Sequence, residues 1–359
     1  MKPTAKLHDL GQSLWLDNIT RTILADGTLR GYIEELSVTG LTSNPTIFDK
    51  AISGGDAYDQ HIAELGDGGR SAEEVFFELA LADLRDATDL FAGVHERTAG
   101  VDGYCSLEVS PKLADDTEAT IAQAADLHGR AGRDNLFVKI PGTPAGLPAI
   151  EESIFAGIPI NVTLLFSREH HLAAADAYMK GIERRIEAGL DPDVASVASI
   201  FMSRWDVAVT GEVPDELHNR LGLAIGFRAY AAYRELLDSP RVQKLMNEGA
   251  RPQRLLWAST GTKDPNASDV LYIEGFASPF TVNTMPEPTL HAFADHGEVG
   301  DPVPADGGEC EQVLAEFGAA GIDVDALAER LQEEGKAAFV KSWNDMLDSI
   351  ESKRGALAG

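Results

Sequence analysis

A lysine stands inside an apolar stretch of the sequence, where an ammonium group would be costly. Lys139 lies between Val138 and Ile140, in a run over residues 136–140 that is typical of a buried β-strand. Burial favours the free amine, and a free amine can attack a carbonyl carbon to form an imine. An ion-paired structural lysine fits the position equally well. The sequence thus offers Lys139 as a candidate nucleophile and leaves its role open.

Two carboxylates end other apolar runs. Asp17 follows Leu14, Trp15 and Leu16, and Glu108 ends the run over residues 104–108. Carboxylates on two different strands could supply a base for a hydroxyl and a proton carrier that acts through water. Taken singly, each could also be a helix cap or a member of a structural ion pair.

Small polar residues and one arginine lie at the ends of further runs. The neutral side chains suited to sugar hydroxyls are Asn44, Asn161, Thr163 and Ser199, and Ser259 ends the seventh run. Each of them alone is also compatible with a turn or a cap. Arg204, after the sixth run, could hold an anionic group or form a surface salt bridge.

The elements that must position these residues follow an alternating pattern. Short β-type runs alternate with helical segments, which is typical of parallel strands joined by crossover helices. The expected strands are residues 13–17, 38–42, 104–108, 136–140, 158–163, 194–200, 255–259 and 281–284. Eight such units predict an α/β fold, a (β/α)8 TIM barrel, whose catalytic groups would lie at the carboxyl ends of the strands.

The helical segments show their own signals. Ser71 and Glu74 form a capping-box pattern at the start of a helix expected over residues 71–91. After a loop over residues 298–308, helical sequence continues from 310 to 353. No Gly/Ser-rich linker divides the chain. We therefore expect one domain over residues 1–359, with 310–353 as additional C-terminal helices covering the barrel, and find no chemistry to interpret beyond about residue 300.

Bulk composition narrows the possible partners. The chain has 359 residues and a formal net charge of -28, which would repel nucleic acid. The absence of a long apolar run and of a signal-type start predicts a cytoplasmic protein without a membrane segment. An anionic ligand would need a few placed cations against this background charge.

Metal and nucleotide sites are not predicted. The two cysteines, Cys105 and Cys310, are too few and too far apart for a disulfide framework or a zinc site. The nine histidines lack HxH and HExxH spacing. Residues 260–263 (TGTK) lack the upstream Walker glycine, and no dinucleotide fingerprint follows the first strand.

The segments at the strand ends resemble those of the transaldolase family, in its longer bacterial type. They occur in family order from about residue 13 to residue 290. The matching segments are residues 13–17 (SLWLD), 42–45 (TSNP), 106–109 (SLEV), 138–143 (VKIPGT), 161–167 (NVTLLFS), 199–204 (SIFMSR), 257–261 (WASTG) and 281–286 (TVNTMP).

The resemblance implies a retro-aldol transfer through a Schiff base on Lys139. Asp17 would take the proton of the C4 hydroxyl, and Glu108, through a water held with Thr163, would serve imine formation and hydrolysis. Asn44 and Asn161 would hold the three-carbon carbanion. Because the protonated imine is the electron sink, no metal or organic cofactor is implied.

The implied reaction moves a dihydroxyacetone unit from sedoheptulose 7-phosphate or fructose 6-phosphate to glyceraldehyde 3-phosphate or erythrose 4-phosphate. It belongs to the non-oxidative pentose phosphate pathway, in an enzyme that is a monomer or a homodimer.

The same resemblance places the substrate phosphate and the sugar. Arg204 and Ser259 match family positions that hold the phosphate, and Ser199 matches one near the sugar. The compact type has a second arginine where this chain has Gly261, so Lys263 is a candidate for the second cation.

Two alternatives remain. A sugar-phosphate aldolase of the same superfamily uses the same lysine, but it resembles a transaldolase with Gln in place of Glu108 and Tyr in place of Phe201. A catalytically inactive barrel that serves as a binding protein would not need Lys139, Asp17 and Glu108 together.

Overall fold

Eight parallel strands form a closed barrel in the computed structural model, which describes residues 1–66 and 69–357. The strands follow one another in chain order around the barrel, and β8 pairs with β1. Their bounds are β1 Ser13–Asp17, β2 Val38–Thr42, β3 Cys105–Glu108, β4 Leu136–Pro141, β5 Ile160–Leu165, β6 Ser196–Phe201, β7 Arg254–Ala258 and β8 Val282–Met285. The predicted TIM barrel is confirmed, and each predicted strand overlaps its observed counterpart.

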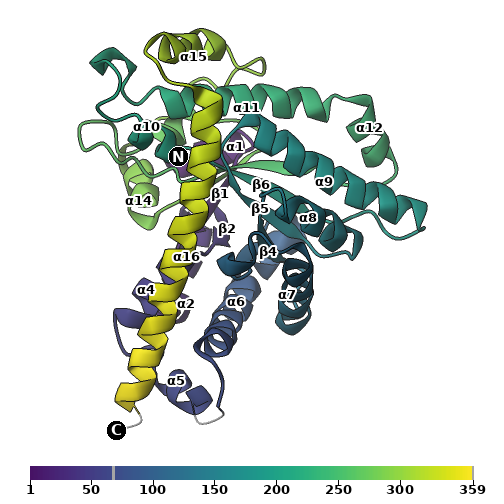
Figure 1. The fold of residues 1–359 in the computed structure, drawn as a ribbon, viewed down its shortest axis with the longest axis vertical. Helices are drawn as coiled ribbons and strands as arrows, with labels where there is room; N and C mark the ends of the chain where they lie inside the picture. Colours follow the sequence, from purple (N-terminus) through teal and green to yellow (C-terminus); the bar gives the residue numbers. More distant parts are fainter. Residues whose placement is uncertain (67–68, 358–359) are drawn as a thin grey trace.

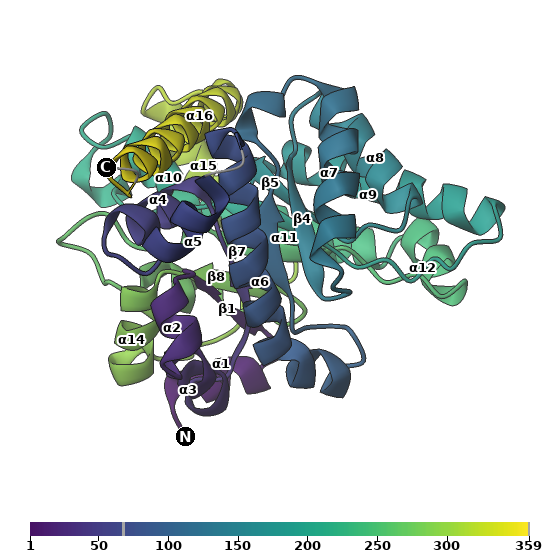
Figure 2. The same ribbon diagram turned by 90° about the horizontal axis from the view of Figure 1, so that it is seen from below.

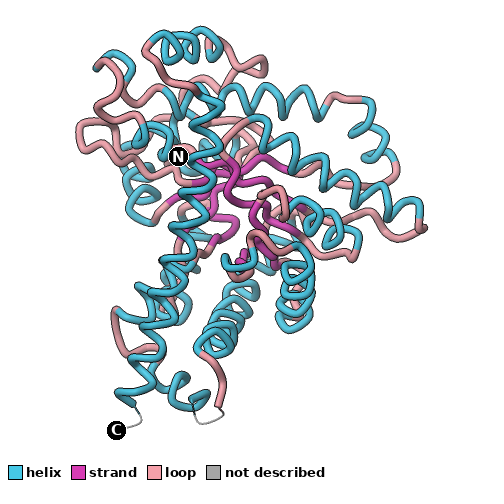
Figure 3. The backbone as a smooth tube through the Cα atoms, in the orientation of Figure 1, coloured by secondary structure: helices cyan, strands magenta, loops and turns pink. Residues whose placement is uncertain are grey.

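Helices surround the strands, which gather at the centre of the molecule (Figure 3). The α-helices are α1 Pro3–Asp9, α2 Arg21–Ala25, α3 Thr28–Glu35, α4 Pro45–Ser53, α5 Asp59–Gly66, α6 Ala72–Arg97, α7 Thr117–Ala131, α8 Gly146–Phe155, α9 Arg168–Glu187, α10 Ser203–Ala208, α11 Leu221–Leu237, α12 Pro240–Asn247, α13 Leu271–Gly275, α14 Glu287–His296, α15 Cys310–Ala319 and α16 Val324–Leu357. Short 3-10 turns are η1 Pro111–Leu113 and η2 Asp215–Leu217. Within residues 1–66 and 69–357, no helix combines the length and the apolar character needed to cross a bilayer.

Helix α6 begins where the capping box predicts. The Ser71 side chain accepts a hydrogen bond from the Glu74 backbone N–H at 3.3 Å, and the Glu74 carboxylate accepts one from the Ser71 N–H at 2.7 Å. Two of the N–H groups that a helix start leaves unpaired are thereby satisfied. The helix then continues to Arg97, beyond the predicted end at residue 91, and buries its apolar side.

The register of the strands pairs several candidate positions on neighbouring strands. Glu108 lies beside Lys139, and Lys139 lies beside Asn161. On the two preceding strands of the barrel, Asp17 lies beside Thr42. Neighbouring positions in a parallel sheet point to the same face, so these side chains share the barrel interior.

Strand β5 is irregular at its carboxyl end. Its register with β6 shifts between Val162 and Leu165, and Leu164 has a φ of 60°. A leucine at positive φ is uncommon and persists only where its surroundings hold it. This irregularity directly follows Thr163.

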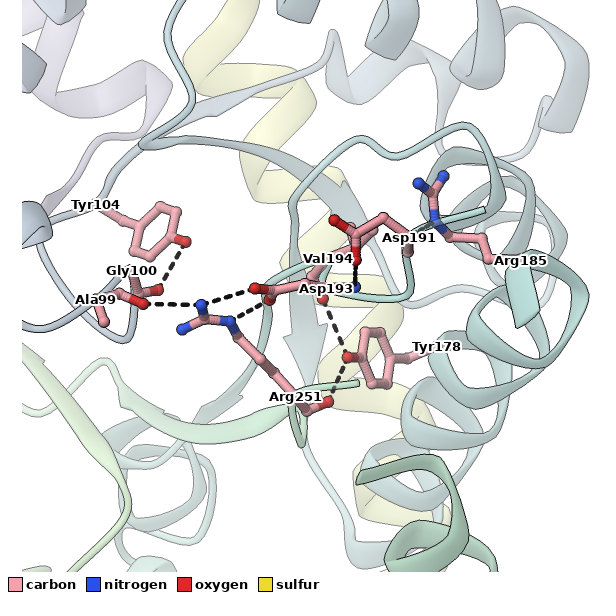
Figure 4. A network of polar contacts seen from close by, with 9 residues as sticks. All are labelled: Ala99, Gly100, Tyr104, Tyr178, Arg185, Asp191, Asp193, Val194 and Arg251. Carbon is pink, nitrogen blue, oxygen red and sulfur yellow. Dashed lines mark hydrogen bonds and ion pairs between the residues drawn. The ribbon is translucent and has the colours of Figure 1, made fainter. Parts of the chain in front are cut away.

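The amino-terminal ends of the strands are joined by a separate polar network (Figure 4). Arg251 pairs with Asp193 and donates to the Ala99 carbonyl, while the Tyr178 hydroxyl donates to the Val194 carbonyl at 3.0 Å. These loops lead into β3, β6 and β7. A cavity of about 500 Å³ opens at this end, between Trp15, Phe137 and Phe280 among others. It is remote from the carboxyl ends of the strands, so we assign the chemistry elsewhere.

The C-terminal tail is helical, as predicted, and forms α15 and α16. Helix α16, yellow in Figure 1, runs along the molecule beside α4 and α5 (Figures 1 and 2). Trp343 anchors it, with its ring centroid 5.0 Å from that of Phe76 and 5.6 Å from that of Phe77. Because α4 and η1 follow the carboxyl ends of β2 and β3, α16 crosses the catalytic end of the barrel.

Candidate active site

Lys139 projects into the barrel interior with a side chain that is only 8% exposed. Its Nζ lies 3.3 Å from Glu108 Oε2 and donates a hydrogen bond to the Ser43 carbonyl oxygen at 3.1 Å. The lysine is therefore ion-paired, and its partner is the carboxylate that the sequence also singled out.

Glu108 is the more deeply buried member of this pair, with a side chain 3% exposed. Burial raises its pKa above the ordinary glutamate value; Lys139 opposes this shift and the charge of Asp17 adds to it. Its Oε1 has no hydrogen-bond partner among the residues that the structure describes. Glu108 can therefore hold a proton and exchange it with a water or a substrate hydroxyl.

Asp17 faces the same interior from β1. Burial raises its pKa above the ordinary aspartate value, and the charge of Lys139, a hydrogen bond from Thr42 and the charge of Lys263 oppose the shift in that order. The Thr42 hydroxyl donates to Asp17 Oδ1 at 2.8 Å. Two carboxylates and the lysine amine thus share one charged cluster, which Lys263 also influences.

The neutral residues form a chain beside this cluster. Ser199 Oγ donates to Asn161 Oδ1 at 2.7 Å, and Asn161 Nδ2 donates to Ser106 Oγ at 3.1 Å. On the same strand as Asn161, the buried Thr163 hydroxyl has no partner within the described residues. It is available to a water or a ligand, as is the free Oε1 of Glu108.

Asn44 combines a structural contact with a place at the site. Its side-chain oxygen accepts a hydrogen bond from the Ile47 N–H at 3.0 Å and caps α4. It directly follows Ser43, whose carbonyl binds Lys139. A capping role is therefore present, and the amide nitrogen of Asn44 stays available as a donor.

The predicted phosphate residues lie at the ends of β6 and β7. Ser259 Oγ is 2.8 Å from Ser203 Oγ, and Ser203 directly precedes Arg204. The sequence suggested that Arg204 ends a strand. It lies instead in the first turn of α10, because β6 ends at Phe201 and the chain then enters this short helix. Ser259 is thus linked to Ser203, the chain neighbour of Arg204.

Within residues 1–66 and 69–357, no carboxylate forms a salt bridge or hydrogen bond with Arg204, although Glu334 acts on it electrostatically. Its guanidinium carbon lies 5.2 Å from the ring centroid of Phe201 and 5.8 Å from that of Phe339. Burial lowers its pKa, and the carboxylate of Glu334 opposes the shift. Glu334, however, pairs with Arg330 at 3.8 Å. The guanidinium is therefore poised to bind an external anion.

Some site residues were missed at the sequence level. These are Thr42, Ser43, Ser106 and Ser203, which contact the predicted residues. Each occurs within or beside a segment that resembles the family. These residues could therefore have been predicted from the whole segments, but not from single positions.

The described parts of the chain contain no cluster of three or more His, Cys, Asp or Glu side chains placed to hold a metal ion. Cys105 and Cys310 are both free and buried, and burial raises the pKa of the Cys105 thiol.

A TIM barrel with a buried lysine beside two carboxylates, at the carboxyl ends of its strands, has the arrangement of a Schiff-base aldol enzyme. Residues 14–350 match the family model described as Transaldolase/Fructose-6-phosphate aldolase. The chain belongs to this family.

Curated relatives extend the match over almost the whole chain. A protein named Transaldolase from Saccharopolyspora erythraea is 45% identical over 97% of this chain and 96% of its own length. Transaldolases from Thermobifida fusca and from a Parafrankia species are 44% and 43% identical, each over 99% of both chains. The family resemblance seen in the sequence is thereby confirmed.

Proposed function

We propose that the protein is a transaldolase, a transferase that reversibly moves a dihydroxyacetone unit from a ketose phosphate to an aldose phosphate. Sedoheptulose 7-phosphate and fructose 6-phosphate are the donors, and glyceraldehyde 3-phosphate and erythrose 4-phosphate the acceptors. The observation that carries the proposal is the buried Lys139 amine 3.3 Å from Glu108, with Asp17 facing the same interior. The family match and the names of the relatives support the same activity.

The reaction begins on Lys139. Its amine attacks C2 of the ketose, and loss of water from the adduct forms the imine. Glu108 is suited to deliver and recover the proton for this dehydration, since its raised pKa favours a bound proton and its free Oε1 can meet a water. The unpartnered Thr163 hydroxyl would hold that water.

Cleavage of the sugar then needs a base at the C4 hydroxyl. Asp17 takes this proton, the C3–C4 bond breaks, and its electron pair moves into the protonated imine, which becomes an enamine. The aldose leaves. The enamine carbon then attacks the carbonyl carbon of the acceptor aldehyde, and the proton returns from Asp17 to the oxygen of that carbonyl. Hydrolysis of the imine releases the new ketose. Asn44, Asn161 and Ser199 would bind the hydroxyls of the retained fragment.

The phosphate of the substrate would bind between the ends of β6 and β7. Arg204 supplies a charge that no carboxylate of the described residues pairs with, and Ser259 with Ser203 supplies hydroxyls. Lys263 follows β7 and acts electrostatically on Asp17, so we assign it the second cation.

A simple aldolase, which releases free dihydroxyacetone, would need the enamine to be protonated and hydrolysed quickly. Phe201 offers no hydroxyl for such a proton transfer, and its ring packs 5.4 Å from that of Phe166 and 6.2 Å from that of Phe339. The apolar wall favours an intermediate that persists until an acceptor arrives.

Borohydride trapping tests the proposal. With fructose 6-phosphate and borohydride, mass spectrometry should find a reduced three-carbon adduct on Lys139, and Lys139→Met should abolish both the adduct and the activity. Exchange with erythrose 4-phosphate should exceed release of free dihydroxyacetone. An active enzyme with unmodified Lys139 would refute the mechanism, and dominant dihydroxyacetone release would identify an aldolase.

Further predictions about the pathway, location and assembly of the enzyme accompany the same proposal. A role in the pentose phosphate pathway, a cytoplasmic location, a single domain over residues 1–359, a monomeric or homodimeric state and independence of cofactors all stay predictions.

A further inference from the structure

A glutamine of the C-terminal helix reaches into the catalytic end of the barrel. Gln332, in α16, is 4% exposed. Its side-chain amide donates to the Leu164 carbonyl oxygen at 2.9 Å and to the Gly142 carbonyl oxygen at 3.3 Å. One side chain thus joins the carboxyl ends of two strands that lie far from it in the sequence.

The two carbonyls belong to the ends of the strands that carry chemistry. Leu164 directly follows Thr163 and adopts the positive φ of the β5 irregularity. Gly142 follows β4, the strand of Lys139, and its N–H donates to the Thr163 carbonyl at 2.8 Å. Since the irregular end of β5 departs from regular pairing with β6, the amide of Gln332 supplies a partner for the Leu164 carbonyl.

One helical turn further, α16 approaches the phosphate-binding arginine. A Cβ atom added at Gly335 would lie 3.0 Å from Leu164 Cδ2 and 3.1 Å from Arg204 Nη1, so these groups would have to move by a few tenths of an ångström. Glycine weakens a helix interior, yet here it lets the helix backbone lie directly against the guanidinium. One further turn on, the Phe339 ring lies 5.8 Å from the Arg204 guanidinium carbon.

Residues 332, 335 and 339 have the i, i+3, i+7 spacing of one helix face. We propose that this face of α16 is part of the active site. Gln332 is a positioning residue that holds the ends of β4 and β5, and with them Lys139 and Thr163. Gly335 and Phe339 set the position of the Arg204 guanidinium. The inference rests on the proposed function and adds to it a group of residues outside the barrel strands.

The role of Gln332 is tested with Gln332→Met, which keeps the length of the side chain and removes the donor. The matched control is Gln12→Met at the amino-terminal end of the barrel, where Gln12 is also buried and donates to the Phe276 carbonyl at 2.7 Å and to Thr281 Oγ1 at 2.8 Å. Both variants lose buried hydrogen bonds, so both should unfold at a lower temperature.

Only Gln332→Met should slow the rate of borohydride trapping of fructose 6-phosphate, and its kcat, by about tenfold to a hundredfold, because small misplacements of reacting groups are that costly. Its KM should change little. If folded Gln332→Met traps the adduct and turns over as fast as the Gln12 control, the positioning role is wrong.

The role of Gly335 is tested with Gly335→Ala against Gly355→Ala, in the same helix, where an added Cβ meets nothing within 4 Å. Gly335→Ala should raise KM for fructose 6-phosphate about tenfold and leave trapping with unphosphorylated fructose unchanged. Gly355→Ala should alter neither. Equal KM values for the two alanine variants would overturn this assignment. A wild-type enzyme that forms no adduct would instead refute the proposed function.

Discussion

Arg204 gives the most direct test of how this acidic chain binds an anionic substrate. Its guanidinium is flanked by Phe201 and Phe339 and has no salt-bridge partner in the part of the chain that the structure describes. The replacement Arg204→Met therefore removes the charge without breaking an ion pair seen there. Methionine also preserves much of the apolar contact that the arginine stem makes.

The size of the effect follows from the bonds that are lost. A hydrogen bond to a charged group contributes roughly 1.5–3 kcal/mol, and a guanidinium can give a phosphate two. We expect a loss of about 3 kcal/mol, or roughly a hundredfold in kcat/KM for fructose 6-phosphate. Arg204→Lys keeps the charge but not the planar fork, and should recover roughly half of this free energy.

The assay compares the rate of borohydride trapping with fructose 6-phosphate and with fructose. This half-reaction involves only the donor, so a phosphate on the acceptor cannot obscure the comparison. Arg204→Met should slow the phosphorylated donor alone, and Arg228→Met, which removes a surface pair with Glu311, should slow neither. An equal loss with both donors would show that Arg204 acts on the shape of the site, and no loss would show that the phosphate binds elsewhere.

Two further predictions concern a charged group and a helix start. Burial raises the pKa of Asp17 above 3.8, so kcat/KM should fall with decreasing pH at a point above that value, where the base becomes protonated. Thr42→Val removes a hydrogen bond that stabilises the ionised form and should move this acid limb to higher pH; an unmoved limb in pH–rate profiles would exclude Asp17 as its origin. Ser71→Ala breaks the capping box of α6 and should lower the free energy of unfolding in urea by about 1 kcal/mol, whereas Ser53→Ala, outside any N-cap, should lower it by less than about 0.5 kcal/mol.

The strands were predictable because they are buried on both faces and therefore appear in the sequence as continuous apolar runs. The polar residues that interrupt or end those runs stand out for the same reason, and Lys139, Asp17 and Glu108 were selected as candidates on this basis. Arg204 was misplaced by a few positions, because nothing local distinguishes the end of β6 from the first turn of α10.

Contacts between distant segments could not be predicted. Gln332 occurs in an ordinary helical sequence, and its two acceptors precede it by 168 and 190 positions. The irregularity of β5 could not be predicted either, because Leu164 is an apolar residue in an apolar strand and its positive φ depends on the groups that surround it. Such features follow from tertiary packing, and the hydrophobic periodicity of the sequence does not predict them.

The sequence left Lys139 with two possible roles, an ion pair or a nucleophile, and the structure indicates why these roles are compatible. The ion pair with Glu108 is buried, so both charges lack most of their hydration and the pair depends on the contact across 3.3 Å. Burial also raises the pKa of Glu108, which favours a proton on that carboxyl. A proton that leaves the lysine therefore has an acceptor beside it, and the amine that remains is still held by the Ser43 carbonyl. In the proposed mechanism the ion pair precedes imine formation, and the Glu108 carboxylate in contact with Lys139 accepts the proton that the amine loses.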